Sequence, residues 1–141
     1  MNIYALAVGV VSAVGVVQLF KAWGLESTKW AYPVLLAEFP VNYWAFAIYG
    51  SDSAALLKEI VVGLAFLAVA YIAYKVKAFV TLLLLAFGYV MHAAYDFSHN
   101  FLFVNAGAPT WWPEFCASVD VLIGAYVAYL AFSSPKKSVV A

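Results

Sequence analysis

Four long apolar runs separated by short polar breaks dominate the chain, at about residues 3–23, 53–74, 78–99 and 113–132. At a rise of about 1.5 Å per residue, each run is long enough as a helix to cross a hydrocarbon core about 30 Å thick. The pattern therefore predicts an all-α integral membrane protein. Its single domain, residues 1–141, would hold four transmembrane helices in an antiparallel bundle.

Residues 24–52 break this pattern. Pro33, Glu38 and Pro40 interrupt an apolar stretch that is rich in Trp and Tyr, the residues favoured at membrane–water interfaces. We expect this segment to be interfacial or re-entrant, between the first and second spans. A fifth, interrupted span is the alternative, and it would move the N-terminus to the other side of the membrane.

The composition excludes several functional classes. Hydrophobic residues make up 67% of the chain and charged residues only 10%, with a mean hydropathy of +0.96, whereas soluble domains carry roughly 25% charged residues. Seven lysines balance seven acids and arginine is absent, so no basic stripe exists for nucleic acid. Cys116 is the single cysteine, which excludes an intramolecular disulfide and a Cys-x-x-Cys redox pair.

The lysines predict an orientation, because short loops rich in Lys stay in the cytoplasm. Lys75, Lys77, Lys136 and Lys137 fall on one side of a four-span arrangement. We therefore expect a bacterial or archaeal plasma-membrane protein with both termini in the cytoplasm. The first apolar run lacks a preceding lysine cluster, which favours a spanning helix over a secretory signal.

Ionisable residues inside predicted spans are the candidate functional residues. Such groups are costly in hydrocarbon and usually face a partner or a water-filled cavity. His92, Asp96 and His99 lie within about 60° of arc on one helix face. Glu59 on the second span and Asp120 on the fourth fall at a similar depth, counted from the outer ends. We expect a His/Asp/Glu pocket near the outer leaflet.

Imidazole and carboxylate ligands suit a divalent metal ion such as Zn or Fe. We expect His92, Asp96 and His99 as ligands, with Glu59 or Asp120 as a fourth ligand or catalytic base. The ion would activate water for attack on a lipid or another hydrophobic substrate, which predicts a metal-dependent membrane enzyme such as a hydrolase. Haem is not expected, because both histidines lie on one helix face. Further residues expected to line the pocket are Tyr95, Asn100, Cys116 and Tyr126.

Other interpretations use the same residues. Without a metal, His92 or His99 beside Asp96 could act as a general acid or base. The protein could also bind or transport a metal or small ligand without catalysis, although few polar residues continue inward from the pocket. A third class is an accessory subunit or homo-oligomer in which a His–Asp–Tyr hydrogen-bond network only joins helices.

These residues resemble a family of small bacterial four-span membrane proteins of unknown function. Its shared pattern is a glutamate early in the second span, His-x-x-Trp-Asp-x-x-His-His closing the third, and Cys-x-x-x-Asp on the fourth. The matching positions here are Glu59, residues 92–100, Pro113, Cys116 and Asp120. Tyr95 and Asn100 depart from the pattern. The resemblance covers residues 45–130 and implies the four-span fold without an assigned activity.

Overall fold

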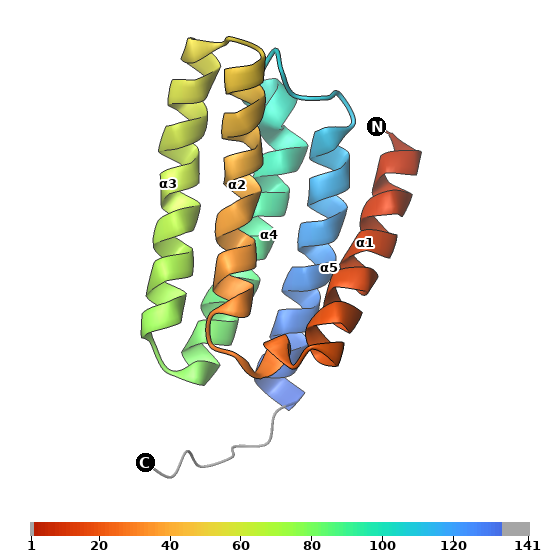
Figure 1. Ribbon diagram of the computed structural model, residues 1–141, viewed down its shortest axis with the longest axis vertical. Helices are drawn as coiled ribbons and strands as arrows, with labels where there is room; N and C mark the ends of the chain where they lie inside the picture. Colours follow the sequence, from red (N-terminus) through yellow and green to blue (C-terminus); the bar gives the residue numbers. More distant parts are fainter. Residues whose placement is uncertain (1, 134–141) are drawn as a thin grey trace.

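The computed structural model describes residues 2–133, which fold as an all-helical bundle (Figure 1). Its elements are α1 (Ile3–Ala22), the 3-10 turn η1 (Leu25–Ser27), α2 (Ala31–Tyr49), α3 (Ser53–Lys75), α4 (Ala78–Leu102) and α5 (Trp112–Ser133). Among them α1, α3, α4 and α5 are long and apolar enough to cross a membrane. These four helices confirm the predicted four-span helical fold.

The segment between the first and second spans differs from the expectation. Most of it is one helix, α2, which has 19 residues and lies beside α3 along the bundle (Figure 1). Pro33 stands in the first turn, where its missing N–H has no intrahelical partner. Pro40 lies inside the helix, at a cost of about 3 kcal/mol. Burial offsets this cost, because one face of α2 is buried: Tyr32, Leu36, Phe39, Tyr43 and Ala47.

The length of α2 decides at which end of the bundle the first and last helices begin and end. Five helices alternate in direction, so the start of α1 and the end of α5 lie at opposite ends of the bundle (Figure 1). An alternation of four helices would instead bring these two points to the same end of the bundle. In this arrangement four lysines lie at the end of the bundle where α1 and α3 finish: Lys21, Lys29, Lys75 and Lys77. Lys136 and Lys137, which contributed to the predicted orientation, lie outside the described residues.

We call this end of the bundle the lysine-rich end; Lys58 lies near the start of α3, at the opposite end. The core near the lysine-rich end is largely apolar, and it includes Leu36, Leu85, Tyr89, Ile123 and Val127. The buried ionisable residues belong to the opposite half. The buried histidines and carboxylates are therefore confined to one half of the bundle.

The α1–α5 contact depends on small side chains. Ala5, Gly9 and Ala13 are the buried residues of α1, one helical turn apart. A Cβ atom at Gly9 would overlap the Ser118 hydroxyl and the Phe115 carbonyl oxygen of α5. This is the close backbone approach that the Gly9/Ala13 spacing predicts, because small residues let helices pack closely in lipid.

Candidate functional site

One face of α4 carries four polar side chains into the core. His92, Tyr95, Asp96 and His99 are all buried, because positions three, four and seven residues apart share a helix face. The neighbouring helices supply Glu59 from α3 and Asp120 from α5. The two histidines and three carboxylates are each at most 1% exposed. They form two separate clusters, which differ in how completely their polar atoms are paired.

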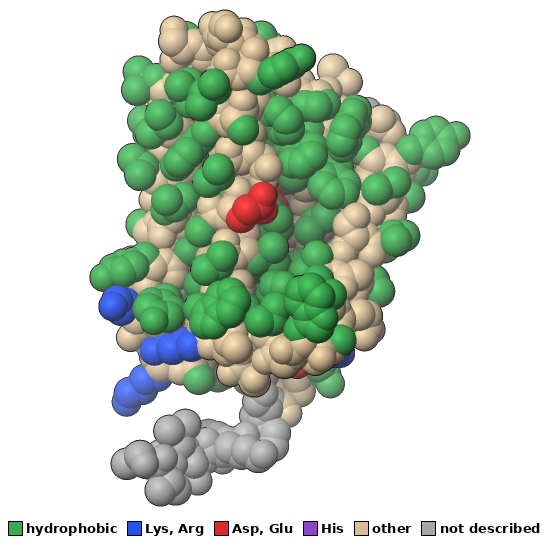
Figure 2. Space-filling view, in the orientation of Figure 1, with side chains coloured by type: hydrophobic (Ala, Val, Ile, Leu, Met, Phe, Trp, Pro, Cys, Tyr) green, Lys and Arg blue, Asp and Glu red, His purple; other side chains and the backbone are tan. Residues whose placement is uncertain are grey.

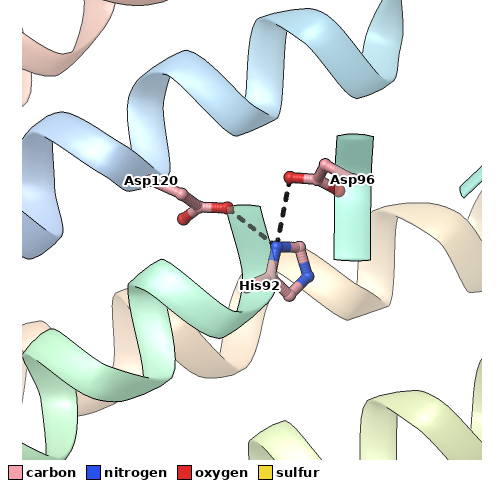
Figure 3. Close-up of side chains that lie close together, drawn as sticks. All are labelled: His92, Asp96 and Asp120. Carbon is pink, nitrogen blue, oxygen red and sulfur yellow. Dashed lines mark hydrogen bonds and ion pairs between the residues drawn. The ribbon is translucent and has the colours of Figure 1, made fainter. Parts of the chain in front are cut away.

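The first group, called the His92 cluster, consists of His92, Asp96 and Asp120. The Nδ1 atom of His92 lies 2.8 Å from Asp120 Oδ2 and 3.3 Å from Asp96 Oδ2. Figure 3 shows the two carboxylates approaching this nitrogen from α5 and α4. One nitrogen or oxygen from each residue lies within 4.8 Å of the other two, which is close enough for all three to hold one metal ion.

The His92 cluster has too few hydrogen-bond donors for its two carboxylates. Tyr43 Oη donates to Asp96 Oδ1 at 2.8 Å, and the single Nδ1 position of His92 faces both acids. Among the described residues, Asp96 Oδ2 and Asp120 Oδ1 have no hydrogen-bond partner. Two buried carboxylates cost several kcal/mol each unless positive charge compensates them. Either added positive charge or a proton on one of the two acids would therefore balance the cluster.

Protonation of His92 and a bound cation are two sources of that charge. Its second ring nitrogen, Nε2, has no hydrogen-bond partner within the described part of the chain. The ring packs instead against Phe66, with centroids 4.6 Å apart and an edge-to-face orientation. A doubly protonated imidazole would leave this N–H donor buried and unpaired, which is unfavourable. A cation bound by Nδ1 would leave the same proton on Nε2, so this nitrogen does not distinguish a protonated His92 from a cation-bound one.

The second group, called the Glu59 cluster, consists of Glu59, Tyr95, His99 and Asn105. Glu59 Oε1 lies 2.8 Å from His99 Nε2 and accepts a bond from Asn105 Nδ2 at 3.1 Å. Tyr95 Oη donates to Glu59 Oε2 at 2.6 Å. Both carboxylate oxygens are thus paired. This cluster joins α3, α4 and the following loop through a satisfied hydrogen-bond network, as expected of a structural role.

Tyr43 of α2 connects the two clusters. Its ring stacks on His99, with centroids 4.4 Å apart and an interplanar angle of 22°, while its hydroxyl bonds Asp96. Its carbonyl oxygen accepts a bond of 3.0 Å from Asn105 Nδ2. A single tyrosine therefore orients a carboxylate of one cluster and a histidine of the other.

Trp44 fastens α2 to α3 beside the Glu59 cluster. Its Nε1 donates to the backbone oxygen of Glu59 at 2.8 Å. Gly63 makes this possible, because a Cβ atom there would lie 2.7 Å from the indole ring. The absence of a side chain at position 63 thus lets α2 pack closely against α3.

The structure does not bring together all three predicted metal ligands. His99 Nε2 faces Glu59, while His99 Nδ1 lies 3.4 Å from Asn100 Oδ1. The reason is axial distance, since seven residues separate His92 from His99 by about 10 Å along the helix. Asp120 takes the position expected for His99. Glu59, expected as a fourth ligand or base, belongs to the other cluster.

The other residues predicted to line the pocket do not all lie in one place. Tyr95 is buried in the Glu59 cluster, and Cys116 is buried on α5 one turn before Asp120. Asn100 is exposed at the surface of α4. Tyr126 does not belong to either cluster, because six residues carry it about 9 Å further along α5 from Asp120. Its hydroxyl donates to the Glu26 carboxylate at 2.7 Å.

Tyr43 and Asn105 are the two functional-site residues that the sequence analysis missed. Tyr43 had a detectable signal, because it belongs to the series of apolar residues three or four positions apart that became the buried face of α2. Asn105 had none. It lies in the loop after α4 and is only 5% exposed, whereas a polar loop residue normally faces water.

A cleft reaches the His92 cluster from the surface between α4 and α5. It has a volume of about 350 Å³ and is lined by Asp96, Phe97, Asn100, Phe101, Pro113 and Glu114. Phe97 and Phe101 are 50% and 91% exposed. The cleft combines aromatic walls with polar groups. Asp96 is the residue that belongs to both the cleft and the cluster.

Comparison of the chain with protein-family models, curated proteins and solved structures found no match. Its function must therefore be inferred from its own residues and their geometry.

Proposed function

We propose that this protein is a membrane-embedded, metal-dependent enzyme whose divalent ion, such as Zn or Fe, is held by His92, Asp96 and Asp120. The observation that carries the proposal is the donor deficit of two fully buried carboxylates around one imidazole. Imidazole with carboxylates is a common ligand set for these ions. Three protein ligands also leave coordination positions open, as catalytic sites do.

The proposed chemistry is hydrolysis of a lipid or another hydrophobic substrate. A bound divalent ion would polarise a carbonyl group or activate water for attack. Tyr43 would hold Asp96 in position through its 2.8 Å hydrogen bond. The cleft between α4 and α5 would admit the substrate to Asp96, with its apolar part against Phe97 and Phe101.

A non-catalytic metal-binding protein is the second candidate. It is favoured by the burial of the three ligand side chains, each at most 1% exposed. A transport function has less support, because the core between the His92 cluster and the lysine-rich end is built mainly from apolar side chains. A role as a subunit of a larger membrane complex rests on no described contact.

Metal analysis of the purified protein tests the site. We expect the wild type, isolated in detergent, to retain a near-stoichiometric divalent ion, and His92→Gln and Asp120→Asn to lose it. Glu59→Gln is the matched control, since it changes a buried carboxylate that is already paired. It should keep the ion but unfold at a lower temperature. A wild type without metal after metal supplementation would contradict the site, as would retention of the ion by Asp120→Asn.

Catalysis needs its own assay. Metal-loaded protein in mixed micelles with an ester-linked lipid should release fatty acid, and both chelation and Asp120→Asn should stop the release. If the protein binds metal stoichiometrically and a panel of ester and amide lipids stays intact, the non-catalytic candidate replaces the enzyme.

We also propose that the lysine-rich end faces the cytoplasm. Lys21, Lys29, Lys75 and Lys77 lie there and only Lys58 lies near the other end of the described bundle, in agreement with the positive-inside rule. The N-terminus would then lie outside and α5 would end inside. The His92 cluster, in the opposite half, would lie near the outer leaflet, as the sequence predicts.

A further inference from the structure

A groove between α2 and α3 opens at the lysine-rich end of the bundle. Its volume is about 580 Å³, and its walls are apolar or aromatic, from Trp30 to Ala37 on one side and from Leu67 to Tyr74 on the other. Seven residues of helix correspond to about 10 Å of length. Trp30, Tyr71 and Tyr74 are 48%, 63% and 42% exposed. The groove is thus an elongated apolar surface on the outside of the bundle.

Two lysines converge at the end of this groove. Lys29 Nζ lies 5.7 Å from the centre of the Tyr74 ring, and Lys75 Nζ lies 5.5 Å from the same ring. Lys75 also lies 5.3 Å from the Tyr71 ring. Neither ammonium group forms an ion pair with an acidic side chain in residues 2–133. Figure 2 shows lysine side chains gathered beside large hydrophobic side chains at the lower left of the viewed face.

We propose that this groove binds an anionic phospholipid, with its phosphate between Lys29 and Lys75 and an acyl chain along the wall from Trp30 to Ala37. Basic residues at the membrane surface attract anionic lipid headgroups, and basic pockets between spanning helices bind them. Trp30 lies at the same level, where tryptophan favours the headgroup region. The site is separate from the His92 cluster and does not depend on the proposed enzyme activity.

Charge favours an anionic phospholipid over a second copy of the chain and over a zwitterionic lipid. A second copy of the chain docked here by a twofold axis would bring the same lysines toward each other, which is repulsive. A zwitterionic lipid offers the phosphate together with a cationic group, so its attraction to two ammonium groups is weaker. An anionic lipid supplies both the apolar chain and the uncompensated negative charge that this groove matches.

Lipid binding to the purified full chain, measured by native mass spectrometry and by thermal stabilisation, tests the proposal. Phosphatidylglycerol should bind more tightly and stabilise more than phosphatidylcholine with the same acyl chains. The double variant Lys29→Gln/Lys75→Gln should lose about thirtyfold in phosphatidylglycerol affinity, from the usual attraction of two lysines near a surface. Lys58→Gln, near the opposite end, is the matched control and should retain the wild-type preference.

Two further measurements distinguish binding of the lipid headgroup from binding of the acyl chain. Ala37→Trp should fill the groove and weaken phosphatidylglycerol binding with both lysines present. Inorganic phosphate alone should not reproduce the stabilisation. Equal binding of the two lipids by the wild type, an unchanged preference in the double variant, or full stabilisation by inorganic phosphate would each overturn the proposal.

Discussion

His92 and His99 show how partner atoms decide the role of a residue. Both are buried histidines on one face of α4. His99 meets one carboxylate whose oxygens also receive bonds from a tyrosine and an asparagine. His92 meets two carboxylates with two unpaired oxygens between them. The first arrangement is complete as a hydrogen-bond network, whereas the second leaves two carboxylate oxygens unpaired, where a metal ion could bind.

Tyr43→Phe tests whether the hydroxyl on Asp96 supports a metal site. The change removes the 2.8 Å bond and leaves Asp96 Oδ1 without its donor. Residues that orient metal ligands typically contribute about 10–100-fold in metal affinity, and we expect a loss of that size in competition with a chelator. Tyr49→Phe is the control, since Tyr49 ends the same helix and is 86% exposed. Equal affinities for both variants would show that the Tyr43 hydroxyl does not support the metal site.

Among the helices, α2 has the largest consequence for the site. It supplies Tyr43, which contacts both clusters, and Trp44, which bonds the α3 backbone. Two prolines and a glutamate made its sequence resemble a broken segment. The helix is nevertheless continuous, because its apolar residues bury one face against α3 and α4 and Glu38 lies on the exposed face.

Two glycine substitutions test the α2–α3 contact. In Gly63→Ala the new methyl group would lie 2.7 Å from the Trp44 ring, so the indole must move and lose its bond to Glu59. We expect a destabilisation of about 1–3 kcal/mol, typical of overpacking. Gly15→Ala is the matched control, because nothing lies within 4 Å of its Cβ position. It should be neutral or stabilise by up to about 1 kcal/mol.

Thermal unfolding in detergent distinguishes these two variants. A lower unfolding temperature for Gly63→Ala beside an unchanged or raised one for Gly15→Ala supports the contact. Equal unfolding temperatures would show that Trp44 does not pack against α3 as described.

The two halves of the bundle contain different kinds of side chain. The half toward the lysine-rich end has a largely apolar core and carries most of the lysines at its surface. The opposite half contains the buried histidines and the three fully buried carboxylates. Because α2 runs the length of the bundle, this polarity also predicts which end of the chain lies on each side of the membrane.

Cysteine labelling tests this orientation. In a Cys116→Ala background, a membrane-impermeant maleimide should label Tyr4→Cys in intact cells, since Tyr4 starts α1 and is 81% exposed. Lys77→Cys, at the turn between α3 and α4, should react only after permeabilisation. Ala106→Cys in the loop before α5 is the external control. Protection of Tyr4→Cys in intact cells would instead place both chain ends inside, as in a four-span arrangement.

The sequence alone determined the four long apolar helices and the α4 face that carries the buried polar residues. These features follow from helix rise, periodicity and hydropathy, which are local properties. The tertiary structure alone decided the partners: Asp120 beside His92, Glu59 beside His99, and Tyr43 between the two clusters. Such pairings depend on how neighbouring helices rotate and stagger, and periodicity within one helix does not specify that.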